Sequence, residues 1–326
     1  MKNHWRHPWA ARMSAMIFIT GLAFFIFAQN DPVPIIHPPG DFVLVNGAKL
    51  WYEIEGKGEP LLLIPGGPGS SHTGSGFHPY FSTLSDSYRI IYFDAFGRGK
   101  SDRAASPREY TFERDVEDIE GIRQALHLGK INVFGFSYGG MVAQAYALKY
   151  PNSVKKLILA HTLFSAEMWQ ANNDNWNNEI RNQCPELWDK IQKLRALGFH
   201  SSAKAHQEIY GQAPAGLFFF YNASNADKLV SEYNWDVYYS MAGDDADFLI
   251  GGDLATLDFR TQLKNLKMPL LILASRFDRV AIPRFAIQFK QYAPQAEFVM
   301  FEKAGHFSFL EDPGSFFKVL RVFLSR

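Results

Sequence analysis

The chain has 326 residues, of which 47% are hydrophobic and 15% aromatic, and its 33 basic residues balance 33 acidic ones. This composition excludes a disordered or fibrous protein and suffices for a large buried core. Because the formal net charge is zero, no whole-protein field attracts nucleic acid, and we expect no nucleic-acid partner. The single cysteine, Cys184, cannot form an intramolecular disulfide and matches no metal-ligand spacing.

The N-terminus carries an export pattern. Basic residues precede the apolar run MSAMIFITGLAFFIFA, and prolines follow it in DPVP. This order is typical of a signal peptide, although Ile26 occupies a position where cleavage favours a small residue. We therefore predict that residues 1–28 direct the protein to the periplasm or outside the cell. An uncleaved anchor, associated with a membrane through residues 13–28, is the alternative.

The predicted folded region starts after a proline-rich linker over residues 29–40. FVLVNGAKLWYEI contains two β-rich runs joined by Asn46 and Gly47, a strong hairpin signal. Further short apolar runs suit strands buried on both faces of a parallel sheet. These runs span residues 60–64, 89–93, 131–134, 156–160, 269–273 and 297–301. A helical pattern begins behind Thr111, a suitable N-cap, and Gly129 is placed to end it.

Alternating strands and helices predict an α/β fold with a mostly parallel central sheet flanked by helices. The alternation is interrupted where aromatic residues, Asn and Gln crowd stretches such as WQANNDNWNNEI and strand-like runs are missing. We predict that residues 161–258 form a mainly helical cap, inserted between two parts of the core, residues 41–160 and 259–326. Asn222, in YNAS, is a glycosylation acceptor only in a eukaryotic secretory route.

GFSYGG, at residues 135–140, lies between a β-branched run and a helix-like run. In this context G-x-S-x-G predicts a tight strand-to-helix turn that presents Ser137 as a nucleophile. A serine hydroxyl also needs a histidine base and an orienting carboxylate. Asp278 and His306 follow the last two predicted strands, in the chain order expected with such an elbow.

The same chemistry needs backbone N–H donors for the oxyanion. LLLIPGGPG follows a predicted strand, and we choose Gly67 from it as one donor, with Gly66 as the second choice. Tyr138, the residue after the nucleophile, supplies the other N–H at a helix N-terminus.

Other polar residues have simpler interpretations. Asp94, in FDAFGRGKSD, is expected to tie down its own loop through backbone N–H groups. We interpret His72 and His127 as packed or surface histidines. His161 lies at a strand end near the expected pocket, where we expect it to contact substrate.

From about residue 41 to its C-terminus the chain resembles an α/β-hydrolase. GGPGSSH, FDAFGRGKSD, GFSYGGMVAQAYALKYP and NWDVYYSMAGDDADF together resemble the proline iminopeptidase group of serine peptidases. The resemblance implies release of N-terminal proline from short peptides through an acyl-enzyme, with no metal and no organic cofactor. It also implies that cap acids bind the free amine of the substrate. Asp247 matches the group's glutamate before phenylalanine, and Glu232 is a candidate for a second acid.

Two departures from the group keep other functions open. Pro65 precedes GGPG where the group has histidine, and FDAFG replaces an FDQRG-like loop. These departures favour the alternative of a carboxylesterase or other small-acyl hydrolase. A third hypothesis is a non-catalytic ligand-binding protein on the same fold, because functions are grafted onto folds.

Overall fold

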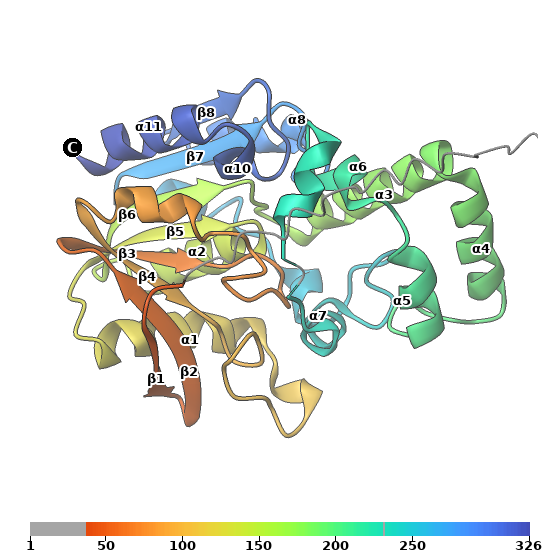
Figure 1. Cartoon of the computed structure of the whole chain (residues 1–326), viewed down its shortest axis with the longest axis horizontal. Helices are drawn as coiled ribbons and strands as arrows, with labels where there is room; N and C mark the ends of the chain where they lie inside the picture. The colour runs from red at the N-terminus through yellow and green to blue at the C-terminus, as the bar shows by residue number, and fades with distance from the viewer. Residues whose placement is uncertain (1–36, 231) are drawn as a thin grey trace, which may run out of the picture. The chain divides into compact units, whose positions relative to one another are not determined.

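A computed structural model describes residues 37–230 and 232–326 of the chain (Figure 1). The export segment predicted for residues 1–28 lies outside the described residues and stays a prediction, as does most of the linker. Within the part that the structure describes, no helix is both long enough and apolar enough to cross a membrane.

The core is an eight-stranded sheet in the order β1-β2-β4-β3-β5-β6-β7-β8. The first two strands form an antiparallel hairpin, β2 pairs antiparallel with β4, and the remaining pairs are parallel. The strands are Gly40–Val45 (β1), Ala48–Glu55 (β2), Glu59–Ile64 (β3), Tyr88–Phe93 (β4), Ile131–Phe136 (β5), Val154–Ala160 (β6), Leu270–Ser275 (β7) and Glu297–Phe301 (β8). The predicted fold class is confirmed, because each predicted apolar run forms a strand.

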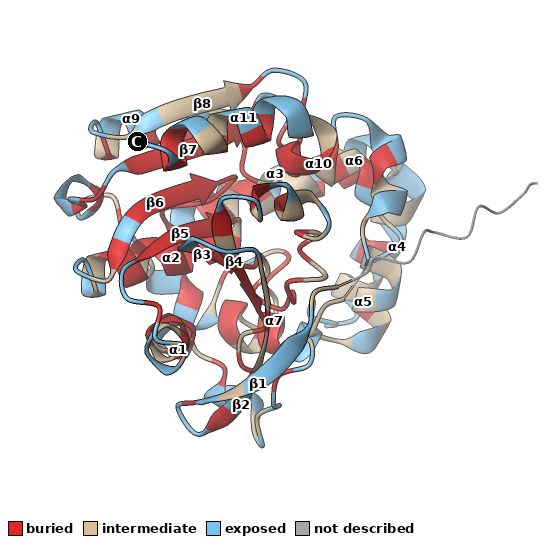
Figure 2. Cartoon of the chain, turned by 60° about the vertical axis from the view of Figure 1, so that its left-hand side comes forward, coloured by how far each residue is buried: buried red, intermediate tan, exposed pale blue. Residues whose placement is uncertain are grey.

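Both faces of the sheet are covered, as its continuous apolar strands require. In β3, Leu61 and Leu63 pack into one layer of the core, whereas Leu62 and Ile64 pack into the other. Figure 2 shows the central strands buried over most of their length. The hairpin turns where predicted, and Asn46 and Gly47 have φ angles of 48° and 81°, as a type I′ turn needs.

Helices on the two faces come from different parts of the chain. Apolar side chains of α1, α2 and α9 belong to one layer, and those of α10 and α11 belong to the other. The helices are Phe112–Ala125 (α1), Tyr138–Lys149 (α2), Ala166–Gln183 (α3), Pro185–Ala196 (α4), Lys204–Tyr210 (α5), Ala215–Phe219 (α6), Trp235–Ala242 (α7), Pro283–Ala286 (α8), Phe289–Tyr292 (α9), Ser308–Glu311 (α10) and Pro313–Leu324 (α11).

The predicted end of α1 needs a correction. Thr111 caps the helix as expected, since its side chain accepts a hydrogen bond from the N–H of Arg114. Gly129 is not the terminator, because the helix ends at Ala125. His127 adopts the left-handed conformation (φ 52°), and the amide of Leu128 donates to the carbonyl of Arg123. This is a Schellman ending with histidine in the position that glycine usually fills.

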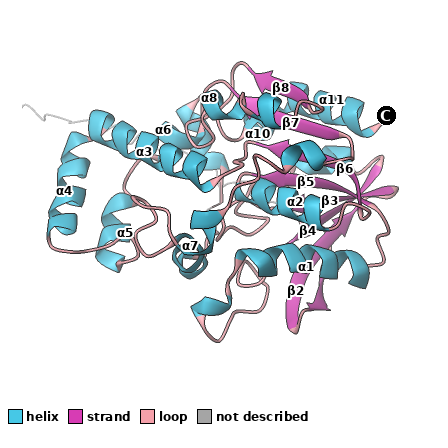
Figure 3. Ribbon diagram, turned by 180° about the vertical axis from the view of Figure 1, so that it is seen from behind, coloured by secondary structure: helices cyan, strands magenta, loops and turns pink. Residues whose placement is uncertain are grey.

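The segment between β6 and β7 carries helices α3 to α7, where we predicted a cap. Figures 1 and 3 show these helices beyond the edge of the sheet at which the parallel strands end. Backbone hydrogen bonds join the two parts: Asn234 donates to Gly69 (2.9 Å), and His306 donates to Phe219 (2.8 Å). The cap therefore contacts two loops at the carboxyl edge, where open α/β sheets build their sites.

Helix α2 approaches β3 so closely that only glycine fits at its second residue. A methyl group at Gly139 would overlap the carbonyl oxygens of Ile64 and Pro65. Because these oxygens belong to the backbone, the overlap is relieved only by moving the helix or the strand.

We expect Gly139→Ala to lower the free energy of unfolding by roughly 2 to 3 kcal/mol, because it overpacks this contact. Urea denaturation measures the change. Gly314→Ala in α11 is the matched control, since a methyl group there meets no atom within 4 Å. The control should be neutral or slightly stabilising, because alanine is favoured in helices. Equal stability of the two variants would contradict the packing argument.

Candidate active site at the carboxyl edge of the sheet

Ser137 occupies a strained turn between β5 and α2. Its backbone angles are φ 54° and ψ −123°, a combination that non-glycine residues rarely adopt. The surroundings hold it there: its amide donates to the carbonyl of Ala160 (2.9 Å), and Thr162 Oγ1 donates to its carbonyl (2.6 Å). The predicted elbow is therefore present as geometry, with the serine at the tip of the turn.

The other two predicted triad members meet at the same edge. Asp278 follows β7, and its Oδ1 accepts the amides of Val280 (2.9 Å) and Ala281 (2.8 Å). His306 follows β8, and its Nδ1 lies 3.1 Å from Oδ1 and 3.0 Å from Oδ2 of Asp278. The imidazole also packs on Phe136, the residue before Ser137, with 4.9 Å between ring centroids.

The electrostatics of this site favour an ionised aspartate. Burial alone would raise the pKa of Asp278, but the charge of His306 and hydrogen bonds from His161 and His306 hold it well below its usual value. Neither Ser137 Oγ nor His306 Nε2 has a hydrogen-bond partner among residues 37–230 and 232–326. Both atoms thus keep their hydrogen-bonding capacity, and catalytic hydrogen bonds often tighten only when a substrate binds.

The loop after β3 supplies the candidate oxyanion donors. The amide of Gly66 donates to Ser75 Oγ (3.0 Å), so it is already used within the loop. Gly67 has φ 130°, which favours glycine, and none of the described residues accepts from its amide. Tyr138 is the first residue of α2, where helix amides lack intrahelical acceptors. The arrangement suits Gly67 and Tyr138 better than Gly66.

A buried ion pair joins this loop to the elbow. The guanidinium of Arg98 forms two hydrogen bonds with Asp115 (2.7 and 2.6 Å), and its Nε donates to the carbonyl of Pro68 (2.7 Å). Tyr138 donates its hydroxyl to the same Asp115 (2.6 Å). Sequence reasoning missed both Arg98 and Asp115, because 17 residues separate them without a periodic pattern.

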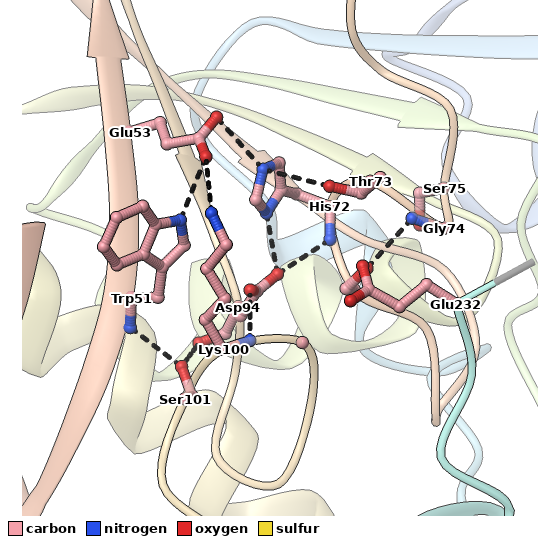
Figure 4. Close-up of polar contacts among 12 residues, drawn as sticks. Trp51, Glu53, His72, Thr73, Gly74, Ser75, Asp94, Lys100, Ser101 and Glu232 are labelled. Carbon is pink, nitrogen blue, oxygen red and sulfur yellow. Dashed lines mark hydrogen bonds and ion pairs between the residues drawn. The ribbon is translucent and has the colours of Figure 1, made fainter. Parts of the chain in front are cut away.

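A second anchor holds the same loop through His72 (Figure 4). The ring of His72 lies between Asp94 (Nδ1 to Oδ1, 2.7 Å) and Glu53 (Nε2 to Oε2, 3.2 Å), and its amide donates to Asp94 (3.0 Å). Burial lowers the pKa of His72, but the two carboxylates outweigh it and raise the pKa to about 9. Asp94 also accepts the amide of Lys100 (3.0 Å), the loop-tying role predicted for it.

Two clusters in the described part of the chain contain side chains that metals prefer. The first comprises His37, Glu53 and His72, and the second comprises His161, Asp278 and His306. In each cluster the candidate ligand atoms already bond to one another. His37 Nδ1, for example, lies 3.0 Å from Glu53 Oε2.

The structure gives the predicted substrate-binding residues unequal settings. Asp247 is buried between the hydroxyls of Tyr238 (3.4 Å) and Tyr239 (3.1 Å), and burial raises its pKa to about 6. Glu232 accepts a short hydrogen bond from the hydroxyl of Ser71 in the loop after β3. His161 differs from its predicted setting, because its ring is fully buried and faces other protein side chains.

Comparison with known proteins identifies the family. A sequence family described as alpha/beta hydrolase fold matches residues 59–313, which is more than half of the chain. The chain belongs to this family. The proline iminopeptidase of Heyndrickxia coagulans is 29% identical over 290 residues, which cover 87% of this chain and 98% of the relative. The resemblance stated from the motifs is thereby confirmed.

Solved structures show the same fold. The crystal structure of a proline iminopeptidase from Mycobacterium smegmatis has a TM-score of 0.67 and 20% identity, covering 88% of this chain and 98% of that one. An esterase from Exiguobacterium antarcticum has a TM-score of 0.60 and 22% identity, covering 88% of this chain and 100% of that one. At these identities the α/β-hydrolase fold is shared by proteins with different substrates.

The His72 anchor predicts that the free energy of unfolding falls as the pH rises from 6.5 to 9. The folded-state pKa of about 9 exceeds the usual 6.5, so the stabilisation is complete below pH 6.5 and is lost as His72 deprotonates near pH 9. On the order of 3 kcal/mol depends on this proton. Urea denaturation across this range tests it. The loss should be absent in His72→Gln, and an equal loss there would assign it to other groups.

Proposed function

We propose that the protein is a serine hydrolase in which Ser137 attacks an acyl carbon and forms an acyl-enzyme. His306 takes the serine proton at Nε2 and returns it to the leaving group, while Asp278 holds the other ring nitrogen. Water then repeats the attack on the acyl-enzyme, again with His306 as the base. The amides of Gly67 and Tyr138 stabilise the oxyanion.

The preferred substrate is a short peptide with a free N-terminus, as for proline iminopeptidases. The observation that carries this proposal is the setting of Asp247. Its carboxylate is buried, and no lysine, arginine or histidine of the described residues forms an ion pair with it. Arg195, the cation whose field reaches it, pairs instead with Asp245. A buried carboxylate without a cation suits a substrate ammonium group, which provides the missing charge.

Aromatic contacts connect Asp247 to the loop after β3, at the carboxyl edge of the sheet. Tyr238 donates to the carboxylate, and its ring lies 6.2 Å from that of Tyr233. Tyr233 in turn packs on Gly69 in the oxyanion loop. Two tyrosines therefore form a chain of contacts from Asp247, the proposed site of the substrate amine, to the loop that carries Gly67. Glu232, the candidate for a second acid, contacts this loop by accepting a hydrogen bond from the hydroxyl of Ser71.

The function is tested by turnover of prolyl-naphthylamide, alanyl-naphthylamide and p-nitrophenyl acetate. We expect a strong preference for the prolyl amide and loss of all turnover, by at least about a thousandfold, in Ser137→Ala. Ester turnover alone, also lost in the variant, would replace the peptidase by the carboxylesterase alternative. Turnover that survives in Ser137→Ala would refute the nucleophile.

Asp247→Asn should separate amine recognition from general acyl transfer. Loss of the charge should lower kcat/KM for prolyl-naphthylamide about a hundredfold and leave p-nitrophenyl acetate within about twofold. In the wild type, kcat/KM for the amide should fall as the pH drops through about 6, because Asp247 then binds a proton. Asp244→Asn is the matched control, since that neighbouring acid is exposed and pairs with His200.

The same variant should be more stable than the wild type at pH 8. The folded protein raises the pKa of Asp247 from 3.8 to about 6, so ionisation costs stability as the pH rises through this interval. Asp247→Asn removes that charge and should raise the free energy of unfolding by about 1 to 3 kcal/mol. Equal losses of kcat/KM for the amide and the ester, together with a lower free energy of unfolding, would refute the amine-binding role.

A further inference from the structure

A second histidine contacts the carboxylate of Asp278. Nδ1 of His161 lies 3.1 Å from Oδ2, the oxygen that the amides of Val280 and Ala281 do not contact. On its other side, Nε2 of His161 lies 2.7 Å from Ser308 Oγ. His161, Asp278 and Ser308 are all buried. The aspartate is thus placed between two imidazoles, and within residues 37–230 and 232–326 only that of His306 has an Nε2 without a hydrogen-bond partner.

The hydrogen bonds define the protonation state of this ring. Burial lowers the pKa of His161 more than the neighbouring Asp278 raises it, so the ring is neutral. An anionic Asp278 accepts hydrogen bonds only, hence the single ring proton lies on Nδ1 and is donated to Oδ2. Nε2 is then the acceptor and receives the hydroxyl proton of Ser308. Every polar atom of the ring is satisfied without a substrate.

The backbone at His161 is also constrained. The residue follows β6 directly, and its amide donates to the carbonyl of Leu273 in β7 (2.8 Å). Its φ of 52° lies in the left-handed region, which is unfavourable for histidine. Such strain persists only where surrounding contacts fix it, and it is concentrated at functional sites. At His161 the contacts that fix the ring are those to Asp278 and Ser308.

We propose that His161 is a positioning residue for the triad, which donates from Nδ1 to Asp278 Oδ2 and keeps the carboxylate turned toward His306. The terminal torsion of an aspartate is broad, so two amides on Oδ1 do not fix its rotation. A donor on Oδ2 completes the constraint. The proposal rests on the proposed serine-hydrolase function, and it is independent of whether the substrate is a peptide or an ester.

Loss of the His161 donor acts on catalysis through the carboxylate of Asp278. Without a donor on Oδ2, the carboxylate gains freedom to turn away from His306, which lowers kcat. Because the buried ring of His161 faces Asp278 and Ser308, KM should change little.

The test compares His161→Ala and His161→Asn in the full chain. Asparagine places an amide donor near the position of Nδ1 and tolerates left-handed backbone angles. We expect alanine to lower kcat about 10- to 100-fold with KM within about threefold, and asparagine to restore most of this loss.

His127 provides the matched control for backbone strain, because it has the same φ of 52° but is exposed and follows the end of α1. His127→Ala should leave kcat and KM unchanged. Where His161→Ala does not fold, Ser308→Ala takes its place, since it frees the ring without altering the strained residue. It should lower kcat less than His161→Ala does, again with little change in KM.

A fluorophosphonate probe separates failure of this proposal from failure of the function. The labelling rate of Ser137 reports the activated serine without any choice of substrate. No labelling of the wild type would overturn the proposed function and this inference with it. Labelling and turnover that are normal in folded His161→Ala, or equally impaired in the alanine and asparagine variants, would overturn the positioning role alone.

Discussion

The ion pair between Arg98 and Asp115 fixes the two sides of the proposed oxyanion hole relative to each other. One donor lies in the loop after β3 and the other begins the helix after β5, so neither element alone sets their spacing. Arg98 bonds Pro68 next to Gly67, while Asp115 receives the hydroxyl of Tyr138. Burial of two charges is expensive, and removal of one partner costs about 3 to 5 kcal/mol. The structure thus uses a costly interaction where a fixed distance between donors matters most.

Local sequence signals were sufficient for most of the fold. Strands, the Asn46–Gly47 hairpin and the Thr111 cap depend on residues within a few positions of one another, so hydrophobic pattern and turn chemistry reveal them. The predicted end of α1 was wrong, because glycine is only the more frequent residue after a helix and not a required one. At His127 the two backbone hydrogen bonds of a Schellman ending outweigh the strain of a left-handed histidine.

The site was predictable only in part. Ser137 carries a local signal, and chain order then places Asp278 and His306. No such signal marks the partners that orient them. The ring of His161 is held by groups 117 and 147 residues away, so a strand-end histidine suggested substrate contact while the structure turns it toward Asp278. Contacts of this kind depend on the direction in which a side chain points after its strand ends. Hydrophobic periodicity does not specify this direction.

Two buried aspartates illustrate how environment assigns chemical roles. Asp278 receives two amides and two imidazoles, and these donors hold its pKa far below the usual value despite burial. The carboxylate of Asp247 receives the hydroxyls of Tyr238 and Tyr239, and burial prevails with a pKa of about 6. Two acids whose pKa values are shifted in opposite directions serve different tasks. The first is a permanent anion that orients a base, so its charge is fully compensated within the protein. The second is an incompletely compensated acid in the cap, as the proposed binding of a cationic substrate group requires.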